Sequence, residues 1–238
     1  LTILEAFGDS ERIEGTAPVL VPSSEAEFGV VSDVDDTVLR SHVTNRLLFA
    51  RAVLLRNARS RPPLAGVAEL YRALEAGPDG RGRNPVFYVS LTAWNLYDVL
   101  EACLAVHDVP LGPLMLRDRG LNASVAPRDK VDRALELFAL YPTLPFVLIG
   151  DSGQGDPESY LQVVRRAPGR VLAVYIRDVS PERRDREVHA VAGEVASYGV
   201  PMVLVGDSAA AARHARERGL ITGAALDRVA AAVRAETG

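Results

Sequence analysis

The chain has 238 residues, 48% hydrophobic and 24% charged, so it is long enough to bury a full core as one large domain. Its formal net charge of -4 argues against a general nucleic-acid binder, which normally carries a basic surplus. The single cysteine, Cys103, excludes an intrachain disulfide, and no apolar run approaches the about 20 residues that a membrane-spanning helix needs. We therefore expect a cytoplasmic, globular protein that binds no nucleic acid.

Residues 1–27 contain Pro18 and Pro22 and show few periodic signals, which favours an extended lead-in or linker. Because the chain begins with Leu1 rather than Met, we expect a further segment to precede it. Residues 28–238 are predicted to form the folded domain.

From residue 28 onward, short runs of β-forming residues alternate with helical stretches. We predict strands near 28–33, 85–90, 113–117, 145–150, 171–176 and 202–206 and helices near 43–57, 64–76, 94–107, 128–140, 156–166, 182–198 and 208–218. This alternation indicates an α/β fold with a mostly parallel sheet, right-handed crossovers and helices on both faces.

Residues 38–84 form a long connection between the first two predicted strands and could be a small cap or lid. No acidic residue occurs between Asp36 and Glu69, whereas this stretch holds Arg40, Arg46, Arg51, Arg56, Arg59 and Arg61. An anionic membrane surface could dock here. The arginines do not fall on one helical face, however, so a packed helix with snorkelling arginines is the favoured interpretation.

Asp33-Val34-Asp35-Asp36-Thr37 directly follows the first predicted strand, at the edge where open α/β sheets bind ligands. Two carboxylates spaced like Asp33 and Asp35 can divide the work of phosphotransfer. The first can attack phosphorus while held on a divalent cation, and the second can lend a proton to the departing oxygen. The alternative is a loop whose Asp and Thr side chains satisfy backbone groups as Asx-turns or helix caps.

Two further signals follow the aspartate motif in the chain. Ser90 closes the second predicted strand, where its hydroxyl could hold a phosphoryl oxygen. Lys130 is the only lysine among 27 Lys plus Arg, and it lies in the first turn of a predicted helix. A cation there opposes the helix dipole, so a purely structural lysine would be unusual at this position.

Asp151 and Asp156 lie five residues apart around glycines after another predicted strand, and such oxygen-only ligands suit magnesium. Gly206-Asp207-Ser208 repeats the Gly-Asp-Ser tripeptide of residues 150–152 but is followed by alanines, so we interpret this copy as a helix cap. The four histidines form no close-spaced zinc pair, and no Gly-x-Ser-x-Gly nucleophile elbow occurs.

Asp-x-Asp-x-Thr, a strand-end Ser, a helix-start Lys and Gly-Asp-x-x-x-x-Asp, in this order over residues 28–156, resemble the four motifs of the haloacid dehalogenase (HAD) superfamily. Longer stretches are similar to the catalytic domain of the actin-patch-protein type of phosphatidate phosphatase: Phe28–Thr37, Tyr88–Tyr97, Gly150–Tyr160 and Tyr175–Val179. One departure is Leu91-Thr92-Ala93, where that family commonly has Ser-Ser-Pro. The resemblance implies a HAD-like, Rossmann-like catalytic domain.

By this resemblance, Asp33 forms an aspartyl-phosphate, and Asp35 protonates the leaving alkoxide and then activates water. Mg²⁺ would be held by the Asp33 side chain, the Asp35 carbonyl, Asp151, and waters anchored partly by Asp156. Lys130 and Ser90 would contact phosphoryl oxygens. Superfamily members that only dehalogenate lack the second aspartate, so Asp35 favours a phosphatase.

The resemblance also implies phosphatidate as the substrate and a peripheral contact with a membrane. Thr37, Trp94, Asn95 and Arg177 follow or flank strand ends and are candidate substrate contacts, although each could equally serve packing or capping. The alternative hypothesis is a phosphatase that acts on a soluble phosphomonoester. A non-catalytic phosphate-binding module is a further hypothesis, which is disfavoured because all four motif positions are filled.

Overall fold

The computed structural model describes residues 2–5, 13–16, 19–34, 37–38, 65–117, 128–153, 155–179 and 182–238. Most of the predicted insert at 38–84, including the predicted helix near 43–57, lies outside these residues. Asp35 also lies outside them.

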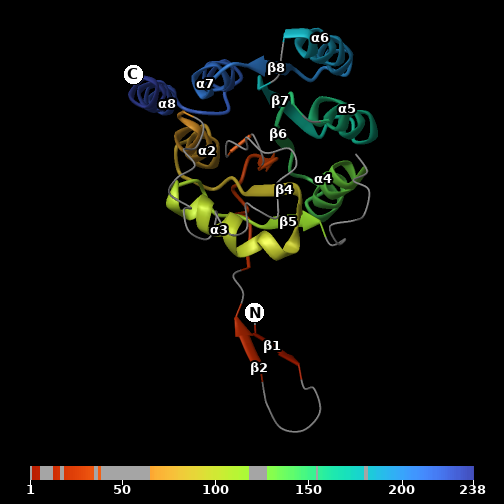
Figure 1. Ribbon diagram of the computed structural model, residues 1–238, viewed down its shortest axis with the longest axis vertical. Coiled ribbons are helices and arrows are strands. Elements are labelled where there is room, and N and C mark those ends of the chain that lie inside the picture. The colour runs from red at the N-terminus through yellow and green to blue at the C-terminus, as the bar shows by residue number, and fades with distance from the viewer. Residues whose placement is uncertain are drawn as a thin grey trace.

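A six-stranded sheet forms the centre of the domain, with strand order β5-β4-β3-β6-β7-β8 and every neighbouring pair parallel (Figure 1). The strands are β3 (Gly29–Ser32), β4 (Val86–Ala93), β5 (Leu114–Arg117), β6 (Phe146–Asp151), β7 (Val171–Arg177) and β8 (Met202–Val205). The predicted α/β fold with a mostly parallel sheet is confirmed.

Helices cover both faces of this sheet (Figure 1). One face is covered by α2 (Val67–Ala76), α3 (Tyr97–Val106), α7 (Ser208–Glu217) and α8 (Gly223–Thr237). The other face is covered by α4 (Arg128–Leu140), α5 (Asp156–Arg166) and α6 (Glu182–Ala196). No helix among the described residues is long and apolar enough to cross a membrane.

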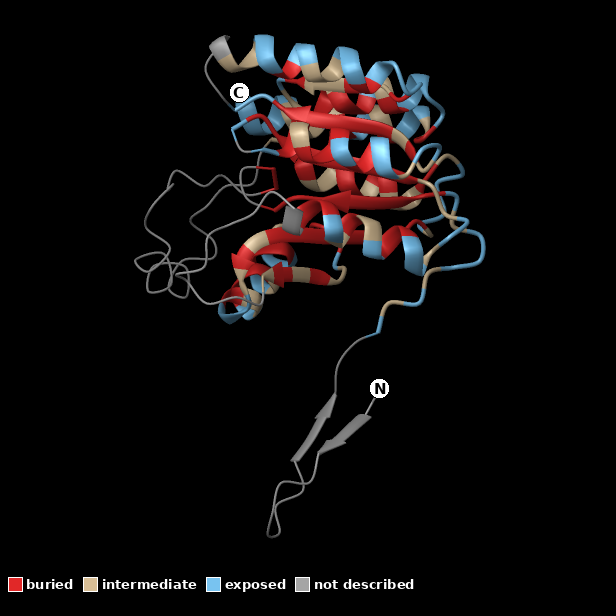
Figure 2. Ribbon diagram, turned by 90° about the vertical axis from the view of Figure 1, so that its right-hand side faces the viewer, coloured by how far each residue is buried: buried red, intermediate tan, exposed pale blue. Residues whose placement is uncertain are grey.

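Strands buried on both faces explain the continuous apolar runs of the sequence, and Figure 2 shows them as a buried layer between the helices. In β6, Val147 packs into the core on the side of α2, whereas Leu148 packs into the core on the side of α4. Val30 and Val31 of β3 divide between the two cores in the same way. The period-two alternation therefore separates two apolar layers instead of an inside from an outside.

Three local features differ from the sequence predictions. The strand predicted to end at Ser90 continues through Ala93, with a shift in its register to β5 between Val89 and Ala93. The last helix, α8, was not predicted, because its alanine-rich sequence gives little contrast between an apolar and a polar face. In the predicted lead-in, β1 (Thr2–Glu5) and β2 (Ile13–Thr16) pair antiparallel.

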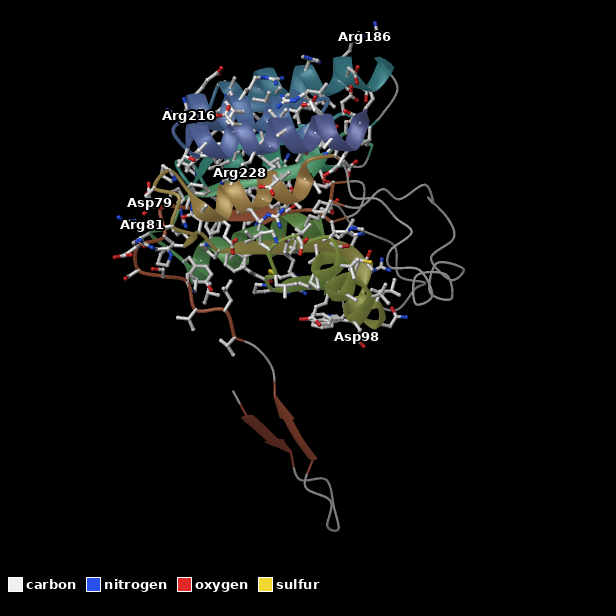
Figure 3. All side chains as sticks on the ribbon, turned by 90° about the vertical axis from the view of Figure 1, so that its left-hand side faces the viewer. Asp79, Arg81, Asp98, Arg186, Arg216 and Arg228 are labelled. Carbon is white, nitrogen blue, oxygen red and sulfur yellow. The ribbon has the colours of Figure 1, made fainter. Side chains whose placement is uncertain are left out.

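The strand register determines at which end of the sheet the predicted site lies. Ser32 pairs with Tyr88 of β4 and with Ile149 of β6, so the residue after it, Asp33, begins the carboxyl edge shared by three neighbouring strands. Figure 3 labels Asp79, which precedes β4 in the chain, and Asp98 of α3, which follows β4, on opposite sides of the molecule. The candidate site lies at the end of the sheet that Asp98 marks.

Candidate active site

The carboxyl edge of β3 and β6 holds a buried cluster of three carboxylates and one ammonium. Lys130 Nζ lies 2.8 Å from Asp33 Oδ1 and 2.5 Å from Asp156 Oδ1. Asp33, Asp151 and Asp156 each offer a carboxylate oxygen within 4.8 Å of the other two, and none is more than 1% exposed. The structure therefore brings together four of the predicted site residues, from the carboxyl ends of β3 and β6 and the first turns of α4 and α5.

Backbone contacts place the three aspartates. The Asp33 amide donates to the carbonyl of Ile149 at 2.9 Å, which joins the end of β3 to β6. Asp151 is the last residue of β6, and its amide donates to Asp156 Oδ2 at 3.1 Å. Asp156 begins α5, where the helix dipole favours an anion.

Gly150 permits the close approach of Asp156 to β6. A Cβ at residue 150 would lie 2.4 Å from Asp156 Oδ2, a separation that real atoms do not sustain. The glycine before Asp151 is therefore required by the packing of this carboxylate and not by an unusual backbone angle.

Lys130 is 5% exposed, and its charge is maintained by its neighbours. Burial by itself would lower the pKa of the Lys130 ammonium, but the carboxylates of Asp33 and Asp156 outweigh burial and raise the pKa above its ordinary value. A lysine that opposes the dipole of α4 is therefore stabilised by two buried anions, and it stays protonated at neutral pH.

Hydroxyl groups of neighbouring residues hold Asp33 in place through hydrogen bonds. The Ser32 hydroxyl donates to the carbonyl of Asp33 at 2.6 Å, and the Tyr71 hydroxyl of α2 lies 2.5 Å from Ser32 Oγ. Burial raises the pKa of Tyr71, so it remains a donor. Thr37 Oγ1 donates to Asp33 Oδ2 at 3.2 Å, which places this predicted residue at the carboxylate itself.

Sequence analysis did not identify Ser32 or Tyr71. Ser32 interrupts an apolar strand with a hydroxyl, and a buried hydroxyl needs a partner, so the pattern carried a weak signal. Tyr71 could not have been found in this way because it lies on another element, 39 residues further along the chain.

The turn after Asp151 is held by the neighbouring strand and helix. The Gly153 amide donates to Asp151 Oδ1 at 2.7 Å, and the Val179 amide donates to Ser152 Oγ at 3.0 Å. Arg184 of α6 donates to the carbonyl of Ser152 at 3.2 Å and forms an ion pair with Glu158 at 2.8 Å. These contacts orient the Asp151 carboxylate toward the cluster.

Ser90 lies in β4 and accepts a hydrogen bond from the Thr92 amide at 2.9 Å. Ser90 and Lys130 line one cavity of about 210 Å³, which therefore opens beside the cluster. Arg177 ends β7 in register with Asp151 and lines a separate small cavity with Thr37 and Tyr71.

Trp94 and Asn95 are exposed in a short 3₁₀ helix, η2 (Trp94–Leu96), where the Trp94 ring stacks on Tyr97 with 5.3 Å between ring centroids. Neither residue is among those that line the two cavities just described. Their predicted contact with substrate stays a prediction, and Asp35 lies outside the described residues.

The carboxylate cluster fits a divalent metal ion. Asp33, Asp151 and Asp156 bring three carboxylates within 4.8 Å of one another in a buried site. Like charges held this close inside a protein repel one another, and a bound cation would offset that repulsion. All three side chains offer oxygen ligands, which hard cations prefer.

Comparison with known proteins gives two kinds of match. The family model of the phosphatidate phosphatase APP1 catalytic domain matches residues 28–178. Phosphatidate phosphatase APP1 of Saccharomyces cerevisiae is 29% identical over 188 residues, which cover 76% of this chain and 31% of the yeast protein. An uncharacterized protein of Schizosaccharomyces pombe is 24% identical over 157 residues, which cover 64% of this chain and 25% of that protein. The chain thus spans only about a third or less of the length of either relative.

Proposed function

The chain belongs to the family of the phosphatidate phosphatase APP1 catalytic domain, and from this premise we propose that it is a Mg²⁺-dependent phosphatase that converts phosphatidate to diacylglycerol and inorganic phosphate. The observation that carries the proposal is the buried Asp33 carboxylate, bound to Lys130 at 2.8 Å and grouped with two further carboxylates. This grouping supports the proposal, because it would supply a nucleophile, a cation for the phosphoryl oxygens and a set of metal ligands at one point of the sheet edge.

Asp33 is the proposed nucleophile. Its carboxylate attacks phosphorus, the bond from phosphorus to the alcohol oxygen breaks, and the alkoxide takes a proton from Asp35. Asp35 then removes a proton from water, the water oxygen attacks phosphorus, and the bond between phosphorus and Asp33 breaks. Inorganic phosphate leaves, and the Asp33 carboxylate is restored.

Thr37, Lys130 and Ser90 orient the nucleophile or stabilise charge on the phosphoryl group. Thr37 and Lys130 each contact one oxygen of the Asp33 carboxylate, which restricts its rotation before attack. The protonated Lys130 also faces the charge that develops on the phosphoryl oxygens, and Ser90 borders the same cavity as a hydrogen-bonding group.

Asp33, Asp151 and Asp156 would hold Mg²⁺. Bound there, the ion would reduce the repulsion between the carboxylate nucleophile and the phosphate dianion. At about 4 Å, two unit charges of one sign repel by about 1 kcal/mol in water and by more in a drier site.

The proposal is tested by Mg²⁺-dependent phosphate release from phosphatidate in mixed micelles, beside a panel of soluble phosphomonoesters. We expect release from phosphatidate to require Mg²⁺ and to be lost in Asp33→Asn, which keeps an oxygen acceptor for Lys130 and so retains the fold. Asp227→Asn, an exposed position on α8, is the matched control and should keep wild-type turnover.

The outcomes separate the alternatives. Release from soluble esters alone would retain the nucleophile and discard the lipid substrate. Acid quenching during turnover should trap a hydroxylamine-sensitive phosphate on the peptide that contains Asp33, and full activity in Asp33→Asn would remove the nucleophile assignment.

A further inference from the structure

A groove leads away from the carboxylate cluster along the β5 edge of the sheet. It is the cavity of about 210 Å³ that Ser90 and Lys130 line, and we call it the edge groove. Its other lining residues come from β4, β5 and α4: Val89, Leu91, Met115, Leu116, Arg117, Asp132, Arg133 and Glu136. Because β5 is the last strand on this side, the groove lies at the margin of the sheet and next to the reacting centre.

The strand side of the edge groove has four apolar side chains, Val89, Leu91, Met115 and Leu116, and two polar ones, Ser90 and Arg117. Val89 and Met115 are register partners on β4 and β5, and both pack with the core on the side of α4. Leu91 lies just beyond Val89, where the register of β4 to β5 shifts, and it lines the same cavity. Met115 and Leu91 are partly exposed, which leaves apolar surface for a ligand to cover.

The charged residues on the helix side are engaged with one another or with neighbours. Arg133 forms an ion pair with Glu136 at 3.0 Å, and Asp132 pairs with Arg166 at 3.1 Å. Among the described lining residues, Ser90 is the only neutral side chain with a hydrogen-bonding group. Beside these charged groups, the partly exposed side chains of Leu91 and Met115 are the apolar surface that a ligand can cover.

We propose that the edge groove binds the diacylglycerol portion of the substrate, with the first methylenes of an acyl chain lying on Val89, Leu91 and Met115. This inference rests on the proposed phosphatase function and adds to it the surface that selects a lipid leaving group. About 210 Å³ is less than the roughly 300–1,000 Å³ of pockets that enclose a whole drug-sized ligand. The groove therefore holds the start of one chain, and the remainder stays in the lipid phase.

The first test measures kcat/KM for monomeric phosphatidates with short acyl chains, kept below their micelle concentration, against glycerol 3-phosphate. Each methylene that enters the groove should raise kcat/KM about fourfold, and the gain should stop once the groove is filled. An increase that continues unchanged with every added methylene would overturn the proposal, because a groove of this size cannot hold a whole chain.

The second test uses Met115→Gln, which keeps the length of the side chain and makes the groove polar. We expect the ratio of kcat/KM for the short-chain phosphatidate to kcat/KM for glycerol 3-phosphate to fall about tenfold. Leu140→Gln is the matched control, since Leu140 is a 67% exposed apolar residue at the far end of α4, and it should leave this ratio at the wild-type value.

Failure of the groove assignment and failure of the proposed function give different results. If wild type cleaves phosphatidate and Met115→Gln leaves the ratio unchanged, the groove assignment is wrong and the phosphatase function stands. If wild type cleaves only soluble esters, both the lipid substrate and the groove assignment are wrong. Titrating the short-chain phosphatidate into Asp33→Asn with and without Met115→Gln measures binding directly, so the result does not depend on turnover; equal affinities would overturn the proposal.

Discussion

Two turns with the same Gly-Asp-Ser sequence follow two strands of one sheet, and they do different things. Residues 150–152 end the interior strand β6, whereas residues 206–208 follow the edge strand β8. Asp151 is fully buried and belongs to the carboxylate cluster, whereas Asp207 is partly exposed, and its side chain accepts the Ala210 amide at 2.7 Å as the N-cap of α7. The predicted helix cap at Asp207 is therefore confirmed.

The glycines of the two turns show the same contrast. A Cβ on Gly150 would collide with Asp156, whereas a Cβ on Gly206 would meet nothing within 4 Å. The tripeptide thus specifies a strand-to-helix turn in both places. Its neighbours, above all Asp156 and Lys130, decide whether the turn joins a charged site or caps a helix.

The largest expected effect on stability comes from removing the Lys130 ammonium, which lies beside the turn that ends β6. Lys130→Met leaves Asp33 and Asp156 buried without the ammonium that contacts both, so the free energy of unfolding should fall by about 3–5 kcal/mol. Urea unfolding in the presence of a chelator measures this loss without compensation by metal. Arg216→Met, an exposed change on α7 (Figure 3), should stay within about 0.5 kcal/mol of wild type.

The stability difference between wild type and Lys130→Met should depend on pH in a direction that the raised pKa of Lys130 determines. The pKa of Lys130 is raised above its ordinary value of 10.5, so its stabilisation is complete below pH 10.5 and is lost as the pH rises through the folded-state pKa. The gap in stability between wild type and Lys130→Met should be constant near neutrality. A gap that closes between pH 7 and pH 9 would show that the ammonium is not held by the carboxylates.

Replacing the aspartate of each turn with asparagine should lower turnover at the turn that ends β6 and leave turnover unchanged at the turn that follows β8. Asp151→Asn removes one ligand charge, and we expect turnover to fall by about 10²–10³-fold with weaker binding of Mn²⁺ in a titration calorimeter. Asp207→Asn should keep wild-type turnover, because Asn caps a helix as well as Asp does. Similar losses in both variants would mean that the second turn also serves the site.

Replacing the glycine of each turn with alanine should give a smaller difference in stability between the two turns. Gly150→Ala forces Asp156 away from β6, and overpacking of this kind costs about 1–3 kcal/mol. Gly206→Ala meets open space and should change stability by less than about 0.5 kcal/mol. Thermal unfolding of the two variants measures the difference, and an unchanged melting temperature in Gly150→Ala would contradict the close approach of Asp156.

The smallest effect is expected at the cap itself. Asp207→Ala removes the acceptor for the Ala210 amide and should lower the free energy of unfolding by about 1 kcal/mol while turnover is retained. Denaturant unfolding and phosphate release from the same preparation test both statements. A loss of turnover without a loss of stability would assign Asp207 to the reaction instead of to α7.

Much of the fold and of the site's location could be predicted from short-range patterns. The alternation of strands and helices indicates a parallel sheet, whose strands bring their carboxyl ends to one edge, and the family resemblance implied that Asp33 and Asp151 share a metal ion. The extension of β4 beyond Ser90 was not predicted, because pairing with β5 overrides the weak strand signal of Leu91-Thr92-Ala93.

The sequence by itself determined the class of fold, the order of the chemical groups and the family to which the chain belongs, because periodicity and motif spacing are local properties of the chain. Only the tertiary structure decided which of two identical turns joins the charged cluster, that Tyr71 supports Asp33 through Ser32, and that a groove lined in part by Leu91 and Met115 borders Lys130. Each of these depends on distances between residues far apart in the sequence, and such distances are set by the packing of helices on the sheet.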